Sequence, residues 1–327
     1  MPTTRPAPAK PARTVTAADP VAGARAALSA AAALQGIDPD GAELLQTGLN
    51  FTFRLPSGVI AKVHGPHVEY IDALRQVRAA RALLAAGIPT AAPVGRISHP
   101  IAVHRMLVTF SEDLGPERPS AGQLGDLVAR LHRIEPLTHI GLRPRDLVAE
   151  AATRLDLLPP TTITDRDRAH LHRFLTEAAA GYDQVAPWPR PVTTHGDIGF
   201  RNAALTPRGP ALIDLETMTV SHPGFDQAAL AWDCDVFGAD PALYAEFADA
   251  YGYDITTTGA PMYEAMTPIF GITAFLAYAE WSRTQPEARL EADHRLRTLL
   301  SRRPLPWDWT LGLTRISTPN RHENIRN

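Results

Sequence analysis

The stretch VTTHGDIGFRNAALTPRGPALIDLE, residues 192–216, decides most of what this 327-residue sequence indicates. It opens with a short β-branched segment and then the tripeptide His195-Gly196-Asp197. Two glycines, Gly196 and Gly199, free the backbone to turn, so we predict a loop that directs the Asp197 carboxylate into a cleft.

The rest of this stretch predicts a β-hairpin with its turn at 206–210 and its strands at 202–205 and 211–215. Pairing that is symmetric about Arg208 sets Asn202 opposite Asp214. Directly opposed side chains lie roughly 5 Å apart at Cβ, so an amide oxygen and a carboxylate can share one hard cation. The spacing therefore predicts a Mg²⁺ site.

A metal pair with a separate carboxylate suits phosphoryl transfer to a hydroxyl. The metal neutralises the phosphates, and the free Asp197 orients and deprotonates the acceptor. Taken alone, Asp197 and Asn202 are ordinary turn formers or caps, and Asp214 and Glu216 could be solvated carboxylates at the end of a strand. Their combination favours the catalytic interpretation. We expect His195 to brace the loop by a hydrogen bond and assign it no role as a base.

Composition limits the alternatives. With 45% apolar residues, 20% charged residues and a formal net charge of -3, the chain can bury a core and has no basic excess for nucleic acid. Cys234 is the only cysteine, which excludes internal disulfides and fits a reducing compartment. We recognise no signal peptide and no membrane span, so we expect a soluble, cytoplasmic protein without a membrane partner.

Lysine is rare in this sequence. Of its 32 basic residues, all but Lys10 and Lys62 are arginine. Lys10 lies in a Pro- and Ala-rich leader, but Lys62 lies in a predicted strand, where a compact ammonium is preferred to a planar guanidinium. A solvated strand lysine explains Lys62 equally well.

The order of predicted elements gives the fold class, an α+β chain with two lobes and a cleft between them. A helix at 22–36 precedes strands at 43–46, 50–55, 59–63, 92–97 and 102–110, with a long helix at 67–86. Further helices are predicted at 121–134, 145–157, 164–180, 225–237, 241–251, 262–283 and 287–301. The domains follow as a disordered leader (1–20), a small antiparallel-sheet lobe with one long helix (21–114), a larger helical lobe (115–312) and a frayed tail (313–327).

The motif residues resemble the aminoglycoside phosphotransferase and choline kinase family, which has a protein-kinase-like fold. The resemblance rests on His195-Gly196-Asp197, Asn202 and Ile213-Asp214 in that order, and spans about residues 40–310. It includes a strand lysine before a helix that ends at Gly87-Ile88-Pro89, then Leu131-His132, and then Phe225-Asp226 at the start of a later helix.

The resemblance implies roles for individual residues. Asp197 is the implied catalytic base, Asn202 and Asp214 are implied Mg²⁺ ligands, and Lys62 is implied to bind the phosphates of ATP or GTP. Other implied positions are Glu216, supporting a second metal; Gly48 and Asn50, in the hairpin that covers the phosphates; and Asp226, bracing the loop with His195.

One position departs from the family pattern. The family helix presents a glutamate to the strand lysine, and here that residue is Gln76, eleven residues before Gly87. A neutral amide can accept a hydrogen bond from Lys62, although the ion pair is lost. Asp72 and Glu69 lie on about the same helix face and are alternative partners.

The acceptor is less defined. Candidate acceptor-site residues are Asp233, Asp235, Glu280 and Trp281, which also suit ordinary helix surface and core. The resemblance allows aminoglycosides, other antibiotics, choline or small metabolites, and the Arg-, Pro- and Ala-rich composition mildly favours an antibiotic. We expect a nucleoside triphosphate and a small hydroxylated acceptor as partners of a monomer or homodimer. The alternatives are a kinase of a metabolite such as choline or a sugar, and a nucleotide-binding pseudokinase scaffold, for which Gln76 is the only support.

Overall fold

The computed structural model describes residues 20–47, 50–66, 68–96, 100–142, 144–185, 190–258, 260–283 and 285–310. The chain divides into two compact units, one made of residues 1–74 and 93–113 and the other of 75–92 and 114–327. The sequence predicts a first lobe of residues 21–114, whereas residues 75–92 belong to the second unit in the structure. The predicted leader, apart from residue 20, and the predicted tail at 313–327 lie outside the described residues.

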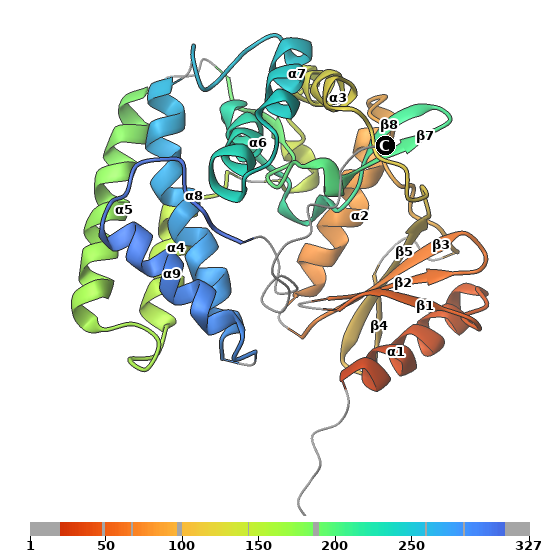
Figure 1. Ribbon diagram of the computed structural model, residues 1–327. Helices are drawn as coiled ribbons and strands as arrows, with labels where there is room; N and C mark the ends of the chain where they lie inside the picture. The colour runs from red at the N-terminus through yellow and green to blue at the C-terminus, as the bar shows by residue number, and fades with distance from the viewer. Residues whose placement is uncertain are drawn as a thin grey trace, which may run out of the picture. The chain divides into compact units, whose positions relative to one another are not determined.

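The first unit is a five-stranded antiparallel sheet with the strand order β1-β2-β3-β5-β4 (Figure 1). Its strands are β1 (Glu43–Gln46), β2 (Phe51–Leu55), β3 (Val59–His64), β4 (Ile101–Val103) and β5 (Met106–Glu112). Helix α1 (Pro20–Gln35) contributes a stripe of small residues to the core of this unit. That core consists of Ala24, Ala27, Leu28, Ala31, Ala32, Phe53, Leu55, Ala61, Val63, Ile101, Val108 and Phe110.

The single strand predicted at 102–110 is wrong. Instead of one strand, this segment holds the end of β4, a tight turn and most of β5, with Val103 paired to Met106. His104 and Arg105 occupy this turn with φ angles of 49° and 63°. Two residues with positive φ suit the right-handed twist of a hairpin, but Asn-Gly is the usual signal for such a turn, so His-Arg gave no warning.

The strand predicted at 92–97 is also wrong for its described part. Residues 92–96 make only an isolated bridge between Pro93 and Ser111 and a hydrogen bond from the Val94 N–H to Phe110. Proline has no backbone N–H to donate to a ladder, so the segment follows β5 without becoming a strand.

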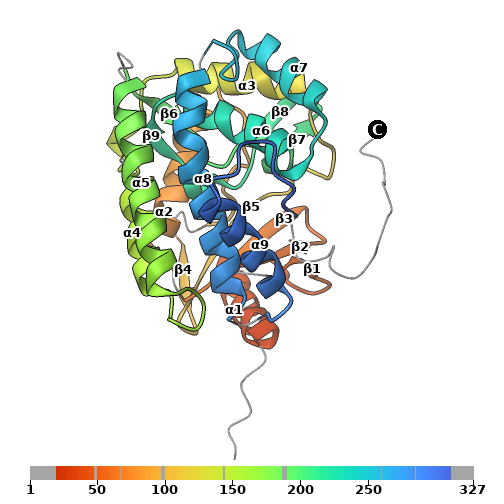
Figure 2. The ribbon, with the colours of Figure 1, turned by 60° about the vertical axis from the view of Figure 1, so that its left-hand side comes forward.

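The second unit is mainly helical. The long helix α2 (Tyr70–Ala85) enters it at Arg75. The other helices are α3 (Ala121–Arg133), α4 (Leu147–Leu157), α5 (Asp165–Val185), α6 (Gly224–Phe237), α7 (Pro241–Tyr251), α8 (Ala260–Trp281) and α9 (Ala288–Leu300). These match the predicted helices, and the largest difference is that α5 continues to Val185 rather than ending at Ala180. Figure 2 shows α8 running beside α9, with which it packs.

Helices α3 and α7 pack closely on each other. Gly125 lies where α3 meets α7, and a Cβ there would collide with the carbonyl oxygen of Phe247. Ser120 caps α3 by accepting a hydrogen bond from the Gln123 N–H, and the Gln123 side chain accepts one from the Ser120 N–H. The start and depth of α3 are thus fixed by local sequence and by one glycine.

Two short antiparallel pairs carry the motif residues. They are β6 (Val192–Thr194) with β9 (Thr219–Ser221), and β7 (Ala203–Thr206) with β8 (Gly209–Leu212). Short 3-10 turns, η2 (Phe200–Asn202) and η3 (Leu215–Thr217), connect them. Within the described residues, no helix has the length and apolar character needed to cross a membrane.

Candidate active site

The loop between β6 and η2 depends on Gly196. This residue has a φ of 83°, and a Cβ would collide with the carbonyl oxygen of Thr217. Only glycine combines that conformation with that close approach. Gly199 differs from expectation, because its φ of -179° is ordinary extended backbone. Its glycine is therefore not required for the turn.

A fully buried carboxylate holds the start of this loop. Asp226, near the start of α6, is 0% exposed and accepts hydrogen bonds from the backbone N–H groups of His195 and Gly196, both at 2.8 Å. Its Oδ2 also lies 3.0 Å from Nε2 of His132. Nδ1 of His132 is in turn 2.7 Å from the Tyr251 hydroxyl.

The pKa of Asp226 shows which interactions dominate. Burial by itself raises the pKa of a carboxyl, but the hydrogen bond and charge of His132, the charge of His195 and the Gly196 N–H outweigh burial. The net result is a pKa below the ordinary value, so Asp226 stays ionised. A buried anion that is this well bonded can hold the loop backbone in place.

His195 connects this loop to the β7–β8 hairpin. The ring is buried, and its Nε2 lies 2.9 Å from the carbonyl oxygen of Ile213. Its backbone carbonyl accepts a hydrogen bond from the Thr217 hydroxyl. His195 thus contacts the hairpin and Asp226 contacts the loop backbone, and neither side chain is exposed.

Asp197 lies on the open side of the loop, and its side chain is 49% exposed. The Asn202 amide donates to Asp197 Oδ2 at 2.9 Å and to the Asp197 carbonyl at 2.7 Å. The other carboxylate oxygen, Oδ1, lies 3.6 Å from Nη2 of Arg201. One oxygen is therefore fixed within the loop, and the second faces a cation on an exposed side chain.

The predicted register of the hairpin is wrong by one residue. Ala203 pairs with Leu212 and Thr206 with Gly209, which leaves a two-residue turn at Pro207-Arg208. Asn202 therefore lies opposite Ile213, and its carbonyl accepts the Ile213 N–H at 2.9 Å. Asp214 follows as an exposed residue with a φ of 60°. Aspartate tolerates this left-handed conformation better than most residues.

The corrected register removes the direct opposition of Asn202 and Asp214 on which the predicted Mg²⁺ site was based. Both Asn202 amide hydrogen bonds to Asp197 are donated by Nδ2, which leaves Oδ1 as the free end of that side chain. Asp214 and Glu216 are both exposed, at the start of η3 and within it. Over the described ranges, no group of three or more His, Cys, Asp or Glu side chains is arranged to hold a metal. Few protein ligands are typical of Mg²⁺, which binds one or two carboxylates together with substrate phosphates.

Of the four candidate acceptor residues, Asp233 is the one close to the loop. Its Oδ2 is 4.0 Å from where a Gly199 Cβ would be. Burial raises the pKa of Asp233 to about 6, Arg201 counteracts this shift and Asp197 adds to it. The electrostatic effects of Asp197 and Arg201 on this partly buried carboxylate show that it lies near the loop that carries Asp197.

The other three candidates engage neighbouring side chains. Asp235 accepts a hydrogen bond from the Tyr263 hydroxyl at 2.7 Å. Glu280 forms two hydrogen bonds at 2.9 Å with Arg154. Trp281 packs on Tyr278 with ring centroids 5.0 Å apart.

The implied nucleotide-binding residues divide between the units. In the first unit, Lys62 lies at the centre of the sheet, paired with Thr52 of β2 and Thr109 of β5. Asn50 lies just before β2, and its side-chain oxygen accepts the Gly65 N–H at 3.0 Å. Gly48 falls outside the described residues. Gln76 is half-buried on the part of α2 that belongs to the second unit.

Two contributors to this site had no predicted role. His132 was noted only as part of the resemblance, and its contact with Asp226 joins residues 94 positions apart. Arg201 gave a weak signal, because an arginine before Asn202 in an arginine-rich chain looks like ordinary surface. Its position four residues after Asp197 was the available clue.

Similar solved structures establish the fold. Amicoumacin kinase hAmiN, solved with AMP-PNP, Ca²⁺ and Ami, superposes with a TM-score of 0.65 at 13% identity, covering 87% of this chain and 95% of that chain. Spectinomycin phosphotransferase APH(9)-Ia, solved with ADP and spectinomycin, gives 0.61 at 15% identity, covering 83% and 93%. A choline/ethanolamine kinase family protein from Mesorhizobium loti gives 0.62 at 19% identity, covering 86% and 94%. The α+β, protein-kinase-like fold predicted from the sequence is confirmed.

The family assignment rests on the sequence itself. Comparison with curated protein sequences gave no significant match. The model of the phosphotransferase enzyme family (APH) matches residues 43–269, which include the loop, the hairpin and Asp226. This match covers well over half of the chain and confirms the resemblance drawn from the motif, so the protein belongs to the phosphotransferase enzyme family.

Proposed function

We propose that this protein transfers the γ-phosphoryl group of ATP or GTP to a hydroxyl of a small molecule, with an antibiotic as the favoured acceptor. The observation that carries the proposal is the way in which the two carboxylate oxygens of Asp197 are held. Asn202 fixes one of its carboxylate oxygens, and the other faces an exposed side chain. A carboxylate held in this way can orient a hydroxyl and accept its proton.

The second unit supplies the remaining chemistry. Asp226 and His195 hold the loop backbone, so Asp197 does not have to be ordered anew in each cycle. Oδ1 of Asn202 and the carboxylate of Asp214 would hold a Mg²⁺ ion, with Glu216 beside them. When bound, that ion would neutralise charge on the phosphates.

The donor is proposed from the family and from Lys62. Lys62 would bind the nucleotide phosphates, with Gln76 as its favoured hydrogen-bond partner. Two of the similar proteins carry AMP-PNP or ADP in their solved complexes, which supports a nucleotide donor. Either ATP or GTP is the proposed donor.

The acceptor class is proposed from the same comparisons. Two of the similar structures are kinases with an antibiotic bound, which favours an antibiotic acceptor here and a role in resistance or self-protection. A kinase of choline, a sugar or another metabolite is the second candidate, favoured by the similarity to a choline/ethanolamine kinase family protein. A pseudokinase scaffold is opposed by the joint presence of Asp197, Asn202, Asp214 and Lys62.

The test is a transfer assay over a panel of hydroxylated compounds. Purified protein is incubated with ATP or GTP, MgCl₂ and spectinomycin, amicoumacin, other antibiotics, choline or sugars. Nucleoside diphosphate release is measured, and the product is checked by ³¹P NMR. We expect a phosphorylated acceptor with the wild type and at least roughly a hundredfold less with Asp197→Asn. Nucleotide binding without turnover of any nucleotide would favour the pseudokinase.

A further inference from the structure

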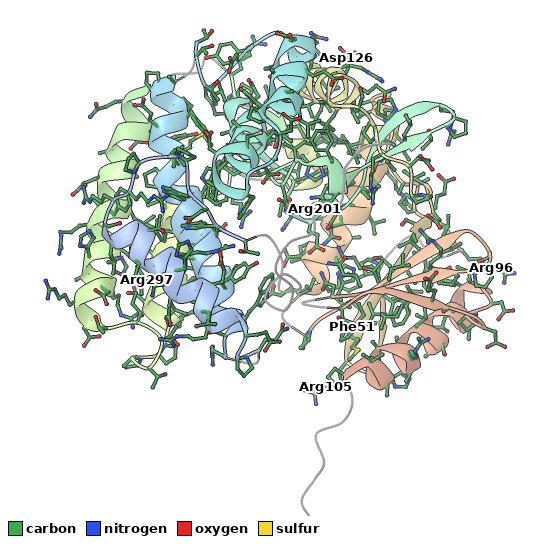
Figure 3. The ribbon with its side chains drawn as sticks, viewed as in Figure 1. Phe51, Arg96, Arg105, Asp126, Arg201 and Arg297 are labelled. Carbon is green, nitrogen blue, oxygen red and sulfur yellow. The ribbon has the colours of Figure 1, made fainter. Side chains whose placement is uncertain are left out.

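The catalytic loop holds a cation that the proposed mechanism has not used. Arg201 is four residues after Asp197, and its guanidinium Nη2 is 3.6 Å from Asp197 Oδ1. Arg201 is labelled in Figure 3, and its side chain is 55% exposed. The electrostatic effect of Arg201 on Asp233 places it near a second carboxylate as well.

This ion pair is poorly suited to stabilising the fold. The two side chains are about half exposed, and 3.6 Å is longer than a good charge-assisted hydrogen bond. Exposed pairs of this kind contribute little to stability because water competes for both charges. The guanidinium can therefore exchange Asp197 for another anion at small cost.

No other arginine or lysine in the motif stretch is placed to do this. Residues 192–216 contain two, Arg201 and Arg208. Arg208 is exposed in the two-residue turn at the far end of the β7–β8 hairpin, away from the loop end where Asn202 lies. The ring of His195 is buried and bonded to Ile213. In this part of the second unit, Arg201 is the cation next to the proposed base.

We propose that Arg201 is a catalytic residue whose guanidinium contacts the phosphoryl group while it is transferred to the acceptor. This inference rests on the proposed function. The acceptor oxygen forms a bond to the γ-phosphorus, its proton passes to Asp197 Oδ1, and the bond from phosphorus to the β–γ bridging oxygen breaks. The electron pair of that bond leaves with the nucleoside diphosphate.

Charge movement in this step explains why the cation lies beside the base. Asp197 loses its negative charge when it takes the proton, so its attraction for Arg201 falls. At the same time, negative charge is spread over the oxygens of the transferring phosphoryl group. A guanidinium matches phosphate oxygens with paired donors, and its move from one anion to the other stabilises the transition state more than the ground state.

The experiment measures ADP affinity with and without aluminium fluoride, a mimic of the transferring phosphoryl group, in the presence of MgCl₂. It needs no identified acceptor. In the wild type we expect aluminium fluoride to tighten ADP binding. Arg201→Ala should bind ADP alone as the wild type does but lose about a hundredfold of that tightening, the scale of one preorganised donor. Arg201→Lys should keep part of it, and Arg208→Ala is the matched control that should keep all of it.

Millimolar guanidinium chloride provides a second test. It should restore the aluminium fluoride effect on ADP affinity in Arg201→Ala and leave Arg208→Ala unchanged. Such rescue is not expected if the role of Arg201 is structural. Wild-type tightening in Arg201→Ala would overturn the assignment of Arg201 and leave the proposed function intact. Absence of tightening in a wild type that binds ADP would also overturn it. A wild type that does not bind ADP would refute the proposed function, and the Arg201 proposal with it. A lower melting temperature and weaker ADP binding in Arg201→Ala, without rescue, would make Arg201 structural.

Discussion

The two sides of the loop between β6 and η2 use charged residues in opposite ways. On the inner side, Asp226, His132 and His195 form a buried anchor in which Asp226 binds two backbone N–H groups and an imidazole. On the outer side, Asp197, Arg201 and Asp214 form an exposed face in which Asp197 keeps one oxygen directed at a long, weak ion pair. The anchor fixes the backbone, and the exposed face carries the groups that we propose to meet the substrate.

Helix α6 shows the same difference within one element. Asp226 and Asp233 lie seven residues apart, and burial raises the pKa of both. Hydrogen bonds reverse that effect at Asp226, whereas Asp233 has only the charge of Arg201 to oppose it and reaches a pKa of about 6. The number of hydrogen bonds that a carboxylate accepts, and not its burial alone, decides whether it stays charged. The predictions below test this division, starting with the exposed face.

Asp214→Ala should abolish transfer, because it removes the strongest charged ligand of the proposed metal site. Asp214 also has a φ of 60°, so alanine adds backbone strain. Asp214→Asn is the matched variant that tolerates this φ without the charge, and it should lose activity at an unchanged melting temperature. Asn202→Ala should be less severe. Mg²⁺-dependent nucleotide affinity that is unchanged in both Asp214 variants would refute the metal site.

Asp197→Asn should lower kcat by at least roughly a hundredfold, since it removes the proton acceptor but keeps the shape of the side chain. Nucleotide affinity and melting temperature should stay close to those of the wild type. Steady-state kinetics and nucleotide titration on the same preparation measure both. A fully active Asp197→Asn would remove the base assignment.

Asp226→Ala should act on stability first. It leaves two backbone donors and His132 without their buried partner, and breaking such a pair typically costs about 3–5 kcal/mol. Chemical denaturation measures the free energy of unfolding. Because the pKa of Asp226 is lowered in the folded state, its stabilising contribution is present above the ordinary pKa and is lost as the pH falls through the folded value. If the variant kept its stability but lost activity, Asp226 would act in the reaction and not as part of the buried anchor.

Asp233→Asn should change the pH dependence of stability in the opposite direction. The folded state favours the protonated Asp233, so in the wild type stability falls as the pH rises from about 4 towards about 6. Asparagine cannot ionise, so the variant should lose this part of the decline. Melting temperatures between pH 4 and 7 measure it, with Asp249→Asn on the exposed surface of α7 as the control. An identical pH profile in wild type and Asp233→Asn would show that Asp233 has an ordinary pKa.

Gln76→Glu should have the smallest effect. If Gln76 bonds Lys62 directly, a glutamate there strengthens the bond and preserves or raises kcat/KM. Lys62→Ala should impair the enzyme through the nucleotide. If Asp72 or Glu69 pairs with Lys62 instead, Gln76→Glu should be neutral or harmful, and Asp72→Ala or Glu69→Ala should reproduce the defect of Lys62→Ala.

The sequence by itself determined the features whose causes are local. The predicted helices match those of the structure, and the strands predicted at 50–55 and 59–63 correspond to the β2–β3 hairpin. The bond from Asn202 to Asp197 spans only five residues, but the sequence predicted a free Asp197 and an Asn202 opposite Asp214, so this bond was found only in the structure. The motif also indicated the family, since its order and chemistry lie within one stretch of chain.

Tertiary structure decided the features that depend on distant partners or on a single backbone angle. The β7–β8 hairpin is centred between Pro207 and Arg208 rather than on Arg208, so the register shifts by one residue and Asn202 lies opposite Ile213 instead of Asp214. His132 meets Asp226 only because α3 and α6 fold against the same loop. The opposite pKa shifts of Asp226 and Asp233 depend on which donors the fold brings to each carboxylate, and no local pattern in the sequence encodes that.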